Sequence, residues 1–204
     1  MKLGIDLKVD YAFKRCFGAQ DRIANLRSLL EHTLRERLDG PILELTILNP
    51  IQDPETDVGK LSILDILARD RSGTLYHIEM QMIGYNYLPK RFLYYSARTY
   101  WSQLNGGENY SDLALAISII ILNDVLFPGL KGYRNVFQMR EAGEGQVFCE
   151  DMEIHLIELP KFEKPAKDLV DGFDQWLYLF RNAQNLDPQF PPPELTLPEA
   201  KEVL

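Results

Sequence analysis

The sequence has little of what marks several common protein classes. It contains only two cysteines, Cys16 and Cys149, which lie far apart in the chain. That number and spacing argue against a disulfide scaffold and a zinc knuckle. No apolar run approaches the ~20 residues that a membrane-spanning helix needs, and the N-terminal stretch MKLGIDLKVD has no signal-peptide core. We therefore expect a cytoplasmic protein without membrane segments.

Basic residues are also in short supply. Lys and Arg together number 22 against 30 Asp and Glu, which gives a formal net charge of −8. This balance argues against a broad nucleic-acid-binding surface, because non-specific affinity for DNA comes mainly from neutralised phosphates. A bound metal ion and a local basic patch can still dominate at a cleft.

Length and composition are those of an ordinary globular chain. The 204 residues, 46% hydrophobic and 25% charged, suffice for one sizeable core. We expect one domain over residues 1–182, followed by a Pro-rich linker and the start of a C-terminal helix over 183–204. A truncated chain and a short member of a longer family both fit this ending.

The stretch 60–83 is typical of a β-hairpin. Two apolar runs, 61–68 and 75–83, flank the turn-forming sequence DRSG. A three-residue loop between Asp70 and Thr74 then sets the register. It places three pairs opposite one another, namely Asp65 with Glu79, Ile63 with Gln81, and Leu67 with His77.

Strand alternation gives this hairpin two different faces. We expect one to face the core, with Ser62, Leu64, Ile66 and Ala68 beside Tyr76, Ile78, Met80 and Met82. The other brings Asp65, Glu79 and Gln81 together among apolar side chains, with no basic residue on the same face. A solvated face is one interpretation. The alternative is a partly buried pair of carboxylates joined by a hard divalent ion such as Mg²⁺.

Four motifs in the chain, taken together, resemble a known family. They are DYAFKRCFG from Asp10, GKLSILD ending at Asp65, HIEMQ from His77 and RFLYYSARTY from Arg91. Their order and spacing resemble the PD-(D/E)XK nuclease family transposases, related to the Rpn recombination-promoting nucleases, over roughly residues 5–180. The resemblance implies an α/β fold with a restriction-endonuclease-like core of order α-β-β-β-α-β, a mixed sheet flanked by helices, and additional C-terminal strands and a helix.

The resemblance also implies a function, that of a metal-dependent DNA endonuclease linked to recombination or mobile elements. Asp65 and Glu79 would bind Mg²⁺, with Mn²⁺ or Ca²⁺ as substitutes, aided by the backbone carbonyl of Met80 and by Asp10. Gln81 stands where the superfamily has its motif lysine, so it would orient the attacking water without supplying positive charge. Lys60 or Arg91 would then supply that charge.

Several candidate residues have structural alternatives. The structural role expected for Asp10 is a helix cap, with the metal site as the alternative, and Glu31 is a weaker candidate for that site. In the expected helix 88–104, Arg91, Tyr95 and Arg98 follow i, i+4, i+7 and share one face. Either these residues contact DNA, with the arginines at its phosphates, or they form a packing seam within the protein. Lys60 would meet a phosphate or be solvated.

The remaining pattern predicts the other elements. The expected helices are 10–18, one that begins at Asp21 as its cap and carries an apolar stripe to Leu38, and 167–180. The expected strands are 42–49, 113–122, 133–140 and 152–159, and His155 is expected to be a packing or surface residue.

A second function class stays open. A nuclease-like fold can serve as a binding module in which Asp65, Glu79 and Gln81 form a hydrogen-bonded cluster without turnover. The expected partner is DNA, and a homodimer is a further hypothesis.

Overall fold

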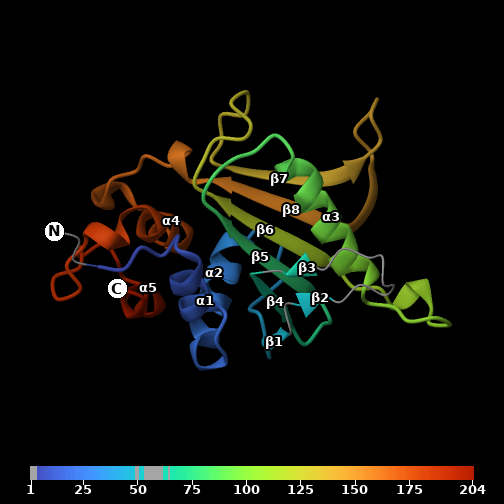
Figure 1. The fold of residues 1–204 in the computed structure, drawn as a ribbon, viewed down its shortest axis with the longest axis horizontal. Coiled ribbons are helices and arrows are strands. Elements are labelled where there is room, and N and C mark those ends of the chain that lie inside the picture. The colour runs from blue at the N-terminus through green and yellow to red at the C-terminus, as the bar shows by residue number, and fades with distance from the viewer. Residues whose placement is uncertain (1–3, 49–50, 53–61, 64) are drawn as a thin grey trace.

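The computed structural model describes residues 4–48, 51–52, 62–63 and 65–204. In this part of the chain a six-stranded mixed sheet carries helices on both faces (Figure 1). The helices are α1 (Asp10–Phe17), α2 (Ile23–Thr33), α3 (Leu88–Trp101), α4 (Gly172–Asn182) and α5 (Pro198–Glu202). The strands are β1 (Thr46–Leu48), β2 (Ile51–Gln52), β3 (Ser62–Ile63), β4 (Ile66–Arg69), β5 (Leu75–Gln81), β6 (Ala116–Leu122), β7 (Arg134–Arg140) and β8 (Val147–Glu158).

The large sheet has the strand order β1-β4-β5-β6-β8-β7. Strands β5, β6 and β8 are mutually parallel, and the outer pairs are antiparallel. The order α-β-β-β-α-β predicted for the core is confirmed as α2, β1, β4, β5, α3 and β6, and β2 pairs with β3 in a separate small sheet. The crossover through α3 is what parallel pairing of β5 with β6 requires.

The hairpin of β4 and β5 has the predicted register. Leu67 pairs with His77, and the backbone N–H of Asp70 donates to the carbonyl of Thr74 at 3.2 Å. Gly73 occupies the loop with φ of +93°, a conformation that favours glycine. The turn sequence therefore sets which side chains share a face.

The first strand of the hairpin is shorter than predicted. Asp65 lies in a bend before β4, and Ile63 pairs with Ile51 of β2 instead of Gln81. The Asp65 carboxylate accepts a hydrogen bond from the backbone N–H of Met80 at 2.8 Å. The N–H of Met80 is the donor that the next ladder hydrogen bond would have used. Because the Asp65 carboxylate satisfies it, β4 need not begin before Ile66.

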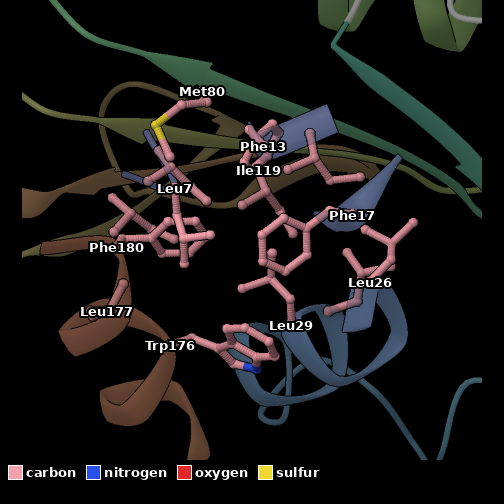
Figure 2. Packing of buried hydrophobic residues seen from close by; sticks show 14 of the residues in the cluster. Leu7, Phe13, Phe17, Leu26, Leu29, Met80, Ile119, Trp176, Leu177 and Phe180 are labelled. Carbon is pink, nitrogen blue, oxygen red and sulfur yellow. The ribbon is translucent and has the colours of Figure 1, made fainter. Parts of the chain in front are cut away.

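The main core lies between one face of the sheet and α1, α2, α4 and α5. Phe17 is its centre, with ring centroids 5.3 Å from Phe13, 5.3 Å from Trp176 and 5.7 Å from Phe180 (Figure 2). The predicted core face of the hairpin is confirmed for Ile66, Ala68, Tyr76, Ile78 and Met80, whereas Met82 was wrongly included and is exposed.

The opposite face of the sheet packs against α3. Leu88 and Phe92 of α3 are buried with Ile120, Leu122 and Leu156. Tyr95 is buried against Leu67 of β4. The interpretation of the second hairpin face as solvated is therefore wrong, since His77 and Glu79 lie in this buried layer as well.

Two predicted helix caps are wrong. The residue before α1 is Val9, and Asp10 is already helical, with its carboxylate 2.8 Å from Lys14 Nζ. Asp21 lies in a short 3₁₀ turn before α2 and binds Arg15. In both cases a nearby cation takes the carboxylate that would otherwise accept from the backbone.

Several element boundaries differ from those predicted. Helix α4 begins at Gly172 because Asp171 caps it, accepting from the N–H of Asp174. Helix α2 ends at Thr33, before Leu38. Strand β1 is shorter and β8 longer than expected. No helix in the described ranges is long and apolar enough to cross a membrane.

The division of the chain at residue 182 stays a prediction. Beyond α4, the side chains of Leu195, Ala200 and Val203 lie in the main core cluster with α1, α2 and α4. This C-terminal stretch therefore shares the core that the earlier helices build.

Phe17→Ala should lower the free energy of unfolding by roughly 3–5 kcal/mol, because it deletes a fully buried ring at the centre of the core. Urea denaturation followed by circular dichroism measures the change. Tyr11→Ala on the same helix, where the side chain is 79% exposed, should change it by less than about 0.5 kcal/mol. Equal losses in the two variants would contradict the assignment of Phe17 to the core.

Candidate active site

Asp65 and Glu79 lie next to each other where β4 and β5 meet. Asp65 is held in its bend by the Met80 N–H, with 16% of its side chain exposed. Glu79, in the middle of β5, is almost fully buried. Its side chain is on the face opposite Met80, and so lies beneath α3.

A polar network holds Glu79 in this buried position. Arg91 of α3 donates to one oxygen of Glu79, and His77 Nε2 lies 3.3 Å from the other. His77 Nδ1 is in turn 3.3 Å from the hydroxyl of Ser118, which contacts Ser96 of α3 at 2.7 Å. Buried polar groups of this kind are stable only when hydrogen-bonded, so α3 and β6 together fix the Glu79 rotamer.

Gln81 joins the same network at the end of β5. Its Oε1 accepts from Arg91 at 3.3 Å, and its Nε2 donates to the carbonyl of Ile83 at 3.0 Å. Arg91 thus bridges Glu79 and Gln81. The guanidinium fixes the orientation of the glutamine amide beside the carboxylates.

The two carboxylates repel each other. Burial and then the charge of Glu79 raise the pKa of Asp65, and the hydrogen bond from Met80 and the charge of Lys14 only partly oppose this. Although burial lowers the pKa of Arg91, the charge of Glu79 raises it overall. Positive charge brought to Asp65 would therefore be stabilising.

Lys14 is the site residue that the sequence interpretation missed. Its ammonium lies 3.4 Å from Asp65 and 2.8 Å from Asp10. The hydrogen bond with Asp10 raises the pKa of Lys14 and keeps it protonated. Asp10 and Asp65 are therefore linked through the ammonium of Lys14, which contacts both carboxylates. The motif DYAFKRCFG contains both Asp10 and Lys14, but nothing in the spacing of these two residues predicts that Lys14 contacts Asp65.

The other predicted site residues fall in different places. Lys60 lies outside the described residues. Tyr95 is 9% exposed and packs edge-on against His77, with the Arg91 guanidinium 5.2 Å from its ring centroid. Arg98 is half-buried and engaged in an interaction of its own. Glu31 accepts from the N–H of Ile42, away from the carboxylate pair.

The donor set suits a hard divalent cation. Because the N–H and C=O of one strand residue point to the same side of the strand, the Met80 carbonyl is directed to the side where its N–H meets Asp65. Two carboxylates and a carbonyl match the few protein oxygens that Mg²⁺ takes beside water and phosphate. Among the described residues no group of three His, Cys, Asp or Glu side chains is placed to hold a metal.

Comparison with known proteins identifies the family of this chain. The family described as PD-(D/E)XK nuclease family transposase matches residues 7–191 of the 204. The chain belongs to this family. The mixed sheet flanked by helices is accordingly the fold of a PD-(D/E)XK protein, and membership supports a nuclease or transposase-related role. No curated protein and no solved structure matches the chain significantly.

Asp65→Asn should raise the melting temperature at pH 7 in the presence of a chelator. The raised pKa of Asp65 means that its ionised form costs stability above the folded-state pKa, and this cost disappears as the pH falls through that value. The asparagine oxygen can still accept from Met80. Differential scanning calorimetry between pH 7 and about pH 4, near the ordinary pKa of Asp, should show the gain shrinking.

Asp21→Asn is the matched control, because Arg15 lowers the pKa of this carboxyl. The ionised form of Asp21 therefore adds stability instead of costing it, and Asp21→Asn should melt no higher than the wild type at pH 7. A lower melting temperature for Asp65→Asn at pH 7 would contradict the repulsion inferred at the site.

Proposed function

We propose that this chain is a cytoplasmic, divalent-metal-dependent DNA endonuclease that hydrolyses phosphodiester bonds in recombination or in the movement of mobile elements. One observation carries the proposal. In a chain of this nuclease family, Asp65 and Glu79 adjoin at the heart of the fold, and burial together with the charge of Glu79 raises the pKa of Asp65. Such a pair costs the fold stability, and this cost favours a role in binding a cation.

Asp65, Glu79 and the Met80 carbonyl would hold Mg²⁺, for which Mn²⁺ or Ca²⁺ can substitute in experiments. When bound, the cation supplies positive charge that lowers the pKa of a water molecule and stabilises negative charge on the scissile phosphate. The amide of Gln81, fixed by Arg91, orients that water.

Lys14 supplies the charge that Gln81 cannot. It reaches Asp65 from α1, so the ammonium that the superfamily places on the second strand comes from a different element in this chain. Arg91 neutralises Glu79 when no metal ion is bound. With a metal ion held at Glu79, the Arg91 guanidinium would be available to a phosphate oxygen, with which it would form charge-assisted hydrogen bonds.

Asp65→Ala and Glu79→Gln should each abolish plasmid nicking and weaken Mn²⁺ binding measured by isothermal titration calorimetry. Glu144→Ala removes an exposed carboxylate in the turn between β7 and β8 and should leave both unchanged. Circular dichroism would verify that all variants fold. Full nicking by both site variants would end the proposal.

Lys14→Ala should lower kcat for nicking by about 10²-fold, because preorganised positive charge at a reaction centre has an effect of this order. Lys14→Arg should recover a substantial part, since it restores charge at the same place. The KM for plasmid should move much less than kcat. An unchanged kcat in Lys14→Ala would remove Lys14 from the mechanism.

A second candidate function rests on the Arg91–Glu79 ion pair. Because Arg91 already neutralises Glu79, the cluster is satisfied without a metal. The chain would then be a nuclease-fold binding module. Absence of both Mn²⁺ binding and nicking in the wild type would favour this function over the endonuclease.

A further inference from the structure

Helix α3 carries exposed aromatic side chains at a regular interval. Tyr87 immediately precedes the helix, and Tyr94 and Trp101 follow at steps of seven residues. These three, here called the aromatic ridge, are 56%, 45% and 54% exposed. Seven residues fall about 20° short of two full turns, so the ridge runs as a nearly straight line along the helix.

The ridge flanks the candidate active site. On a helix with about 100° per residue, Arg91 and Arg98 lie between the aromatic ridge and the buried face that carries Tyr95. Arg91 is the residue that binds Glu79, and Tyr95 packs on Leu67 of β4. The ridge therefore borders the side of α3 that faces the β4–β5 hairpin, which is the side of the carboxylates.

A second aromatic feature lies at the start of the helix. The rings of Tyr85 and Tyr87 are stacked, with centroids 5.2 Å apart and planes within 3° of parallel. Both rings are about half exposed. A further flat ring can extend such a parallel stack, whereas aliphatic side chains gain nothing from the geometry.

The segment that carries the ridge differs in charge from the whole chain. Residues 80–107 contain no Asp or Glu, although the whole chain has a net charge of −8. The same segment holds Lys90, Arg91 and Arg98, all on α3. Aromatic rings interleaved with cations, on a segment without a carboxylate of its own, match an occupant that has both flat rings and negative charge.

We infer that the aromatic ridge and Arg91 bind an unpaired DNA strand and lead it to the carboxylate site. Bases in a duplex already stack on their neighbours, so side-chain rings seated on a helix surface can stack only on bases that are unpaired. Base stacking on aromatic side chains beside a basic track is how proteins bind single strands without sequence preference. This inference deepens the proposed function by naming the substrate class, and binding can be tested without cleavage.

Trp101 makes the test direct. The protein has two tryptophans, and Trp176 is fully buried in the core. Titrating the wild type with single-stranded DNA in a chelator should quench the exposed Trp101 emission and saturate. A duplex of the same sequence should quench it much less. Trp101→Phe should abolish the quenching while anisotropy of a labelled oligonucleotide still reports binding.

Tyr94→Ala and Trp101→Ala should each weaken single-strand binding by roughly tenfold, the order found for one stacked base. Phe190→Ala removes a ring that is 78% exposed but lies after α4, away from α3, and should bind as the wild type does. Normal single-strand affinity in both ridge variants, or no quenching at saturation, would overturn the inference.

Other outcomes distinguish this inference from the endonuclease proposal and from an interface between copies of the chain. Single-strand binding at the ridge without cleavage of any DNA would uphold the inference and refute the endonuclease proposal. Cleavage of duplex DNA that Trp101→Ala leaves unchanged would uphold the endonuclease proposal and refute the inference. If sedimentation shows that Trp101→Ala converts a dimer into a monomer and the wild type shows no quenching, the ridge is an interface between copies of the chain, and the inference is wrong.

Discussion

The burial of Glu79 is the constraint on which the rest of the site depends. A carboxylate at this depth needs partners, and they come from three elements, His77 on its own strand, Arg91 on α3 and, through His77, Ser118 on β6. Helix α3 therefore both covers the second face of the sheet and supplies the cation that makes burial tolerable. Asp65 shares its cation, Lys14, with Asp10, and burial and the charge of Glu79 still raise its pKa.

The hairpin register could be predicted because its cause is local. The loop from Asp70 to Thr74 and the alternation of the flanking runs determine which residues pair. The bend at Asp65 could not be predicted, since an alternating run shows no sign of where the ladder stops. It stops because the Asp65 side chain, instead of a strand partner, takes the Met80 N–H.

Where the cap predictions failed, a nearby cation competed for the carboxylate. Asp10 and Asp21 have the sequence context of helix caps, yet Lys14 and Arg15 bind them. Lys14 joins the site only because the main core packs α1 beside the hairpin. Fold class and most elements follow from local pattern, whereas the full set of charges around Asp65 requires the tertiary structure.

The packing of α1 has a consequence for how the protein matures. Phe13 and Phe17, on the helix that carries Lys14, rest on Phe180 and Trp176 of α4 (Figure 2). During synthesis α1 emerges long before α4, the helix that seats it. Contacts so distant in sequence form late, so Lys14 would reach Asp65 only after α4 has been made and has packed on α1. Until then the chain would hold Asp65 and Glu79 without the ammonium of Lys14, and the set of charges around Asp65 would be complete only once the core has closed.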